Sequence, residues 1–180
     1  MAKVCVFLAE GFEEVEGLTV VDLLRRAGEE VFMVSIGTSL EVTGSHGIKV
    51  SADRLFEEAD YSDADMLVLP GGMPGTLHLG EHKGLTELLI KFNEADKKVA
   101  AICAAPGVFG ANGILKGRKA TCYPGCEEKL KGAVLSEEAV VRDKNVTTSR
   151  GVGTAIAFAL ELISQLEGEV KAHQIKIGRA

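Results

Sequence analysis

The chain has 180 residues, of which 46% are hydrophobic and 26% charged, with a formal net charge of −6. This composition is typical of a folded domain with its own core and excludes a disordered chain. The negative balance and the scattered Lys and Arg disfavour nucleic acid and anionic membranes as partners. No apolar run has the length of a signal peptide or a membrane span, so we expect a cytoplasmic protein that contacts no membrane.

Short apolar runs alternate with longer amphipathic ones along the chain. Val4–Ala9 reads as a buried strand, and Glu14–Gly28 then shows helical spacing of its apolar residues. Glu30–Ile36 is the second predicted strand, and Leu40–Asp53 reads as a hairpin that turns near Gly44–Gly47. The later predictions are a strand at Asp65–Gly72, a helix at Lys83–Ala95, a strand at Lys97–Cys103, a helix from near Pro106 to Gly113, strands at Lys119–Tyr123, Ala139–Asp143 and Asn145–Ser149, and a helix at Gly153–Gly168.

Strands that alternate with helices, several of them apolar on both faces, indicate a parallel sheet covered on both sides. No linker, repeat or low-complexity segment divides residues 1–180. We therefore predict one domain with an α/β, flavodoxin-like three-layer sandwich, a mainly parallel sheet and a small β-hairpin. In such sheets, functional residues gather at the carboxyl ends of the strands.

Cys103 ends a predicted strand, and small residues and a Pro-Gly pair follow it in the stretch AAICAAPG. A strand that turns abruptly into a helix projects its turn residue away from both, and only small neighbours tolerate the crowding. The start of the helix favours a thiolate, and the N–H of Ala104 with one from the turn Gly71–Gly72 could bind an oxyanion. A buried cysteine that only fills the core is the alternative. The position at a strand end favours a nucleophile.

Three carboxylates, Glu13, Glu14 and Glu16, open the first predicted helix, where negative charge is favourable in any protein. Glu16 lies on a different helical face from the other two, beside the proposed turn at Cys103. An ionised Glu16 would repel a thiolate, whereas a Glu16 kept protonated by burial would donate a hydrogen bond to it. A functional site therefore requires a protonated Glu16.

The four cysteines and four histidines show no metal-binding spacing. Cys122 and Cys126 form one pair, but a structural zinc site needs four ligands. We expect free thiols, as in a reducing compartment, and no metal site.

Four stretches, LAEGFEEVE, VLPGG, AAICAAPG and TSRGVGTAIAFAL, occur in this order and at separations that resemble the ThiJ/PfpI superfamily. Within it, the chain most resembles the branch of the Parkinson-associated protein DJ-one and its bacterial relatives, over nearly its whole length. The resemblance implies a single domain related to class I glutamine amidotransferases, a homodimer, and neither a metal nor an organic cofactor.

The resemblance also implies roles for individual residues. Cys103 matches the family's oxidisable nucleophile, and Glu16 matches its protonated carboxyl partner. The other matches are Gly72 and Ala104 to backbone donors that face the sulfur, and Arg26 and Arg150 to positions at the dimer interface and at an anion-lined site.

The chain departs from the pattern of this branch at two positions, and from that of the protease-like members at a third. Tyr123 stands where the branch often has a histidine near the cysteine, and Tyr is a poor base at neutral pH. His46 replaces an expected arginine, which predicts weaker and pH-dependent anion binding. Protease-like members carry a histidine directly after the cysteine, where this chain has Ala104, so we do not expect a Cys–His peptidase.

Two functions remain open from the sequence. The first is cofactor-independent attack of Cys103 on a small reactive carbonyl or glycated substrate, as in glyoxalase III or protein deglycase activity, which protects against carbonyl or oxidative stress. The second is a redox sensor or redox-regulated chaperone, in which Cys103 is oxidised to the sulfenic and then the sulfinic acid.

Overall fold

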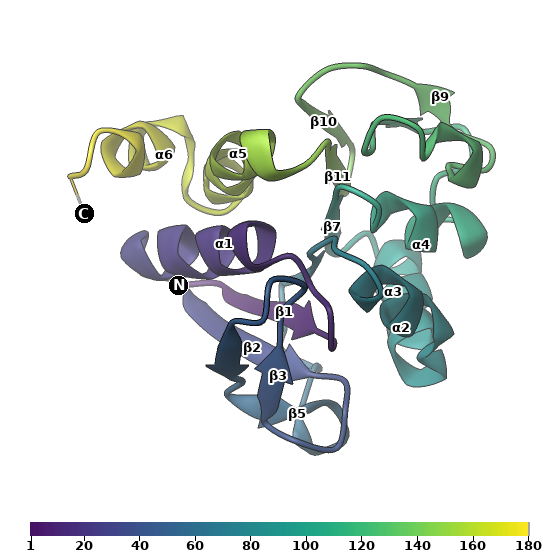
Figure 1. Ribbon diagram of the computed structural model, residues 1–180. Coiled ribbons are helices and arrows are strands. Elements are labelled where there is room, and N and C mark those ends of the chain that lie inside the picture. The colour runs from purple at the N-terminus through teal and green to yellow at the C-terminus, as the bar shows by residue number, and fades with distance from the viewer. Residues whose placement is uncertain (180) are drawn as a thin grey trace.

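The computed structural model describes residues 1–179 and is built around a seven-stranded sheet with the order β10-β11-β7-β6-β1-β2-β5 (Figure 1). All neighbouring strands of this sheet run parallel except β10, which is antiparallel to β11. The strands are β1 (Lys3–Leu8), β2 (Glu30–Ser35), β5 (Arg54–Leu55), β6 (Met66–Leu69), β7 (Lys98–Ile102), β10 (Val140–Asp143) and β11 (Val146–Ser149). The predicted mainly parallel sheet is confirmed.

Two small pairs of strands lie outside this sheet. The predicted hairpin is confirmed as β3 (Glu41–Thr43) and β4 (Lys49–Ser51), which pair antiparallel. The strand predicted at Lys119–Tyr123 is wrong beyond its first two residues, because only β8 (Lys119–Ala120) forms, paired with β9 (Val134–Leu135). The next residues bend over the ends of two strands instead: the N–H of Thr121 donates to the Thr148 hydroxyl, and that of Tyr123 donates to the Cys103 carbonyl.

Helices cover both faces of the sheet (Figure 1). On one face, α1 (Glu14–Arg26), α5 (Ala155–Glu167) and α6 (Glu169–Lys176) surround one apolar cluster. On the other, α2 (Gly75–Glu81), α3 (Lys83–Glu94) and α4 (Pro106–Ala111) enclose a second. Two of these helices, α2 and α6, had no predicted counterpart, because each spans only two turns and carries few apolar residues.

The strand β1 shows why both faces need cover. Val4, Val6 and Leu8 pack toward α1 and α5, whereas Cys5 and Phe7 pack toward α2, α3 and α4. All five side chains are almost completely buried. Their burial on two faces explains the continuous apolar run in the sequence.

The chain reverses its winding direction at β1, since β2 adds on one side of it and β6 on the other. Such a switch point opens a crevice at the carboxyl ends of the strands. The loops after β1 and β6 meet there, and the N–H of Glu13 donates to the Gly71 carbonyl at 2.8 Å. This crevice is the place in the fold where a site is expected.

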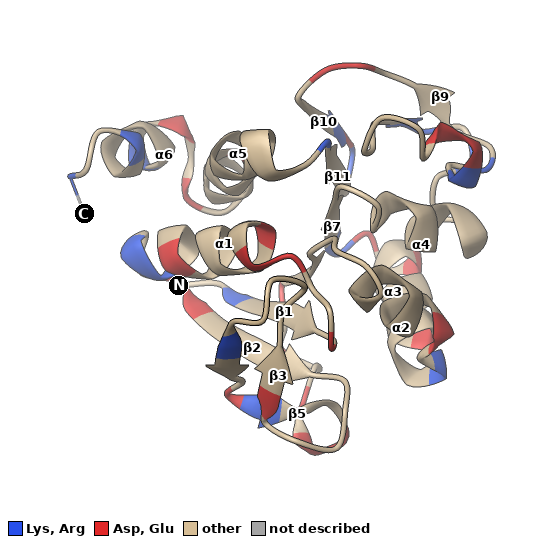
Figure 2. Cartoon of the chain, in the orientation of Figure 1, with Lys and Arg blue, Asp and Glu red and all other residues tan. Residues whose placement is uncertain are grey.

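Charged residues are spread over the elements, with Lys and Arg interspersed among Asp and Glu (Figure 2). Acidic residues gather at the start of α1, which carries Glu14 and Glu16 in its first turn. None of the helices within residues 1–179 combines the length and the apolar character needed to cross a bilayer.

Candidate functional site

Cys103 occupies a sharp turn between β7 and α4, with a φ of 67°. This left-handed conformation costs a residue other than glycine about 1–3 kcal/mol, so the surroundings must hold it in place. The Cys103 N–H donates to the Ser149 carbonyl at 3.0 Å, and its own carbonyl accepts from the Tyr123 N–H at 2.8 Å. The predicted turn is therefore present, and hydrogen bonds tie it to the end of β11 and to the segment that follows β8.

The loop after β6 closes over this turn at Gly71. A Cβ atom at Gly71 would lie 2.5 Å from the Cys103 Cβ, 3.0 Å from its Sγ and 2.6 Å from the Glu16 Oε2. Only glycine leaves room for both side chains. The absence of a side chain at Gly71 thus allows the thiol and the carboxyl group to meet.

Glu16 is completely buried on α1 and faces this turn. Its Oε2 accepts the Gly71 N–H at 2.9 Å, while its Oε1 has no hydrogen-bond partner in the described part of the chain. Burial raises the pKa of Glu16 to about 7, an effect that interactions with Cys103 and the Gly71 N–H oppose. At neutral pH both the protonated and the charged form are therefore populated, as a proton-transfer group requires.

The electrostatics of Cys103 correct one expectation. The start of α4 was expected to favour the thiolate, yet the pKa of Cys103 is raised to about 12. Burial is the largest cause, followed by the negative charge of Glu16, and the N–H groups of Ala104 and Gly72 oppose both. The helix α4 has only six residues, so its dipole is too small to outweigh burial. Protonation of Glu16 removes the repulsive part of this shift.

A pocket of about 560 Å³ opens above the thiol. It brings together most of the residues singled out from the sequence: Glu16, His46, Gly72, Cys103, Tyr123 and Arg150. Ala104 directs its N–H toward the sulfur but lines a different cavity, behind the turn. Arg26 lies in the last turn of α1, pairs with Asp22 at 2.8 Å and does not line the pocket.

Two further side chains that line the pocket, Arg150 and Tyr123, carry polar groups that a substrate could contact. The Arg150 Nη1 donates to the Thr121 hydroxyl at 3.2 Å, which holds the guanidinium at the pocket wall. Tyr123 is half exposed, and its ring lies near Gly151, where an added Cβ would be 3.4 Å away. The pocket therefore offers one arginine and one phenol beside the partly buried thiol and the buried carboxyl group.

Glu14 has a role that sequence reasoning missed. Its buried carboxylate accepts the backbone N–H groups of His46 at 2.8 Å and Ile48 at 3.3 Å, and lies 3.1 Å from the His46 Nδ1. Although burial opposes it, the pKa of Glu14 is lowered to about 2 by the hydrogen bond of its own backbone N–H and by those of His46 and Ile48. Glu14 thus anchors the hairpin between β3 and β4 beside the pocket, and no local signal in the sequence pointed to this contact.

His46 is held by acidic neighbours at the pocket rim. The hydrogen bond to Glu14 and the charge of Glu13 raise the pKa of its imidazole. Ligand atoms of Glu13, Glu14 and His46 lie within 4.8 Å of one another, a spacing that could suit a metal ion. The N–H groups of the hairpin already stabilise the buried charge of Glu14. We therefore interpret these three residues as a structural contact that holds the hairpin in place, not as a metal site.

Comparisons with known proteins agree with this geometry. A family model described as the DJ-1/PfpI family matches residues 2–165. Protein DJ-1 homolog A of Arabidopsis thaliana is 41% identical over 174 residues, covering 96% of this chain and 44% of that protein. A deglycase of Pyrococcus abyssi is 34% identical over 168 residues, covering 92% of this chain and 99% of that protein.

Among solved structures, oxidized DJ-1 of Toxoplasma gondii superposes with a TM-score of 0.95 and 35% identity over 98% of this chain and 97% of that one. The predicted flavodoxin-like fold is thereby confirmed. The chain spans less than half the length of the two Arabidopsis relatives it matches.

Proposed function

The chain belongs to the DJ-1/PfpI family, in the branch that its motifs predicted, and from this premise we propose that it converts small reactive carbonyls with the Cys103 thiol and the Glu16 carboxyl group. The observation that carries the proposal is the contact of a partly buried thiol with a buried carboxyl group of pKa about 7, at the floor of an open pocket. The similarity to a deglycase supports it. No cofactor is required by this chemistry.

The first step joins the Cys103 sulfur to the aldehyde carbon of a 2-oxoaldehyde such as methylglyoxal. Because the pKa of the thiol is about 12, the S–H proton has to leave as the S–C bond forms. The charged form of Glu16 accepts that proton and passes it to the aldehyde oxygen, which completes the hemithioacetal and leaves the carboxylate charged for the next step. The thiol thus reacts without first forming a stable thiolate.

The second step moves hydrogen within the substrate. Glu16 removes the proton from the hemithioacetal carbon, the resulting enediol is protonated at the neighbouring carbon, and a thioester of a 2-hydroxy acid results. Water then hydrolyses the thioester, which releases lactate and restores the thiol. One substrate carbon is oxidised and its neighbour reduced, so the sum is methylglyoxal plus water giving lactate, with no external oxidant.

The test is turnover of methylglyoxal without glutathione. Wild-type protein should form lactate, and Cys103→Ala should form none. Cys126→Ala is a matched control, because Cys126 is also a partly buried free thiol but lies outside the pocket. If wild type and Cys103→Ala are equally inert, the enzymatic proposal is wrong.

A redox sensor is the second candidate, and one observation favours it. The N–H groups of Gly72 and Ala104 interact with the Cys103 sulfur itself, where they would hold the oxygens of a sulfenate or sulfinate. Mild peroxide should then convert Cys103 to the sulfinic acid, detected by mass spectrometry. Clean sulfinate formation in a protein that does not turn over methylglyoxal would favour the sensor.

We also propose that two copies associate around this pocket. Val152, which lines the pocket, is exposed, and so are three other large apolar side chains: Val15 in the first turn of α1, Ile48 just before β4 and Ile156 in the first turn of α5. Exposed apolar side chains that gather on a folded domain mark an interaction surface. Light scattering should give twice the mass of one chain, and a monomer at micromolar concentration would refute the dimer.

A further inference from the structure

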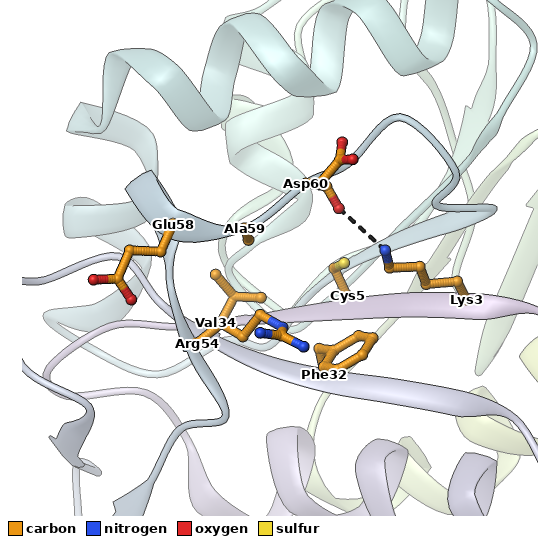
Figure 3. A pocket seen from close by; sticks show the side chains of 8 residues that line it. All are labelled: Lys3, Cys5, Phe32, Val34, Arg54, Glu58, Ala59 and Asp60. Atoms are coloured by element: carbon orange, nitrogen blue, oxygen red, sulfur yellow. Dashed lines mark hydrogen bonds between the residues drawn. The ribbon is translucent and has the colours of Figure 1, made fainter.

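Two cavities of the fold differ in what they offer a ligand. In the cavity at the edge of the sheet, between β1, β2 and β5, the side chains of Cys5 and Val34 are almost completely buried, and Lys3 and Arg54 lie over the Phe32 ring (Figure 3). The pocket above the reactive thiol shares no lining residue with that cavity, and it has exposed side chains. Of the two, the pocket above the thiol is the one with apolar surface that a ligand can reach.

This pocket is larger than a small aldehyde requires. Its volume of about 560 Å³ lies in the range of about 300–1,000 Å³ that is usual for pockets of drug-sized ligands. The reacting groups, Cys103 and Glu16, lie at its floor. A molecule with three carbon atoms, such as methylglyoxal, would leave most of the volume empty. The remaining space can hold a larger group attached to the substrate carbonyl.

Gly151 leaves a gap beside the reacting groups. A carbon atom at the position of a Gly151 Cβ would lie 3.8 Å from the Glu16 Oε1 and 3.4 Å from the Cδ2 of the Tyr123 ring. These are ordinary contact distances, so the missing side chain leaves room for a substrate carbon between the two groups. The Glu16 Oε1 has no hydrogen-bond partner within residues 1–179. A substrate in this gap would contact the carboxyl group on one side and the aromatic ring on the other.

The backbone that carries the Tyr123 ring is held next to the thiol. Its N–H donates to the Cys103 carbonyl at 2.8 Å, and its carbonyl accepts the Cys126 N–H at 3.0 Å. The side chain itself stays 52% exposed. Of the two large apolar side chains exposed in the pocket, Val152 belongs to the proposed contact between two copies, so the ring of Tyr123 remains for a substrate.

Building on the proposed carbonyl chemistry, we propose that Tyr123 and Gly151 form a subsite for a flat aromatic group, which makes aryl 2-oxoaldehydes such as phenylglyoxal better substrates than methylglyoxal. The aryl group enters the gap at Gly151 and packs on the ring of Tyr123, while its aldehyde carbon reaches the Cys103 sulfur. Two aromatic rings attract each other beyond the apolar area that they bury, a gain that a methyl group does not provide. The reaction steps are unchanged, so phenylglyoxal plus water gives mandelate.

The first test compares kcat/KM for the two aldehydes in the full-length protein without glutathione. Initial rates are used, because both aldehydes also modify arginine side chains. Wild type should favour phenylglyoxal about tenfold or more, and Tyr123→Ala should lower this preference about tenfold, chiefly through phenylglyoxal. Tyr123→Phe retains the ring and should retain the preference. Leu135→Ala is the matched control and should leave both rates unchanged, because Leu135 is 54% exposed but lies outside the pocket.

The second test examines the subsite without turnover. Mandelate and lactate share the 2-hydroxy acid group and differ in a phenyl against a methyl group. In a titration of the ¹⁵N-labelled protein, mandelate should shift the backbone amide signals of Tyr123 and Gly151 and should bind about tenfold or more tightly than lactate. Tyr123→Ala should remove most of this difference.

Three results would overturn the proposal. They are a preference for phenylglyoxal that Tyr123→Ala leaves unchanged, equal binding of mandelate and lactate, and a loss of preference in Tyr123→Phe as large as in Tyr123→Ala, which would assign the effect to the hydroxyl group. If neither aldehyde is converted but mandelate still binds more tightly, the proposed function fails and the subsite stands. If methylglyoxal gives lactate but the Tyr123 ring favours neither phenylglyoxal nor mandelate, the subsite alone fails.

Discussion

Glu16→Gln should stabilise the protein, and increasingly so as the pH rises. The pKa of Glu16 is about 7 in the folded chain, whereas 4.5 is its ordinary value. A carboxyl group with a raised pKa holds its proton more tightly in the folded state. Below pH 4.5 the group is protonated in both the folded and the unfolded chain, so it does not oppose folding there. As the pH rises from 4.5 through 7, the folded chain increasingly bears the cost of a buried charge. A glutamine at this position has no charge to bury.

The magnitude follows from the two pKa values. At 1.36 kcal/mol for each pKa unit, the ionised Glu16 opposes folding by about 3 kcal/mol above pH 8 and by about 1 kcal/mol at pH 5. The free energy of unfolding of Glu16→Gln should therefore exceed that of wild type by an amount that grows by about 2 kcal/mol between these two pH values. If the substitution also removes a hydrogen bond, the difference in free energy of unfolding changes by the same amount at pH 5 and at pH 8, and its growth between them is unaffected.

The assay is urea unfolding of wild type and Glu16→Gln at pH 5, 6, 7 and 8, at one fixed protein concentration. Glu87→Gln, at an exposed position on α3, controls for the change in net charge and should give a constant difference. A difference between wild type and Glu16→Gln that stays constant from pH 5 to 8 would refute the raised pKa of Glu16.

Two further predictions concern the packing around the pocket. Gly71→Ala places a Cβ 2.5 Å from that of Cys103 and should lower methylglyoxal turnover about 100-fold or more, whereas Gly37→Ala, whose added Cβ meets only a side-chain oxygen at 3.7 Å, should leave turnover unchanged. Equal turnover in both variants would contradict the close approach at Gly71. Glu14→Gln should destabilise the protein by about 1–3 kcal/mol at pH 7, and the deficit should shrink as the pH falls from 4.5 toward 2, where the wild-type carboxylate is protonated as well. Urea unfolding at pH 3 and 7 measures this change, and an equal deficit at both would contradict the lowered pKa.

The turn at Cys103 could be predicted because its signals are local. A short apolar run predicts β7, and the small residues that follow tolerate the crowding of a strand that turns into a helix. The position of Glu16 followed similarly from the periodicity of one helix. The loops after β1 and β6 were expected at the same edge because parallel strands point their carboxyl ends in one direction.

The electrostatics of the same residues could not be predicted in this way. Glu16 and Gly71 are 55 positions apart, and their contact is what buries the carboxyl group against the thiol. A sequence pattern indicates that Cys103 lies just before a helix but not that burial outweighs the helix dipole. The anchoring of the hairpin by Glu14 likewise depends on N–H groups more than 30 positions away. These effects arise only after the chain has folded.

The raised pKa of Cys103 also separates the two proposed functions through Glu16. A thiol with a pKa of about 12 is ionised in roughly one molecule in 10⁵ at pH 7, so attack on a carbonyl depends on a nearby base that takes its proton. Oxidation by peroxide depends on the thiolate instead, which the charge of Glu16 disfavours. Glu16→Gln removes both the base and the repulsive charge, so it should abolish methylglyoxal turnover while leaving sulfinate formation equal or faster. Loss of both reactions together would mean that Glu16 only positions the sulfur, and retention of turnover would exclude Glu16 as the base.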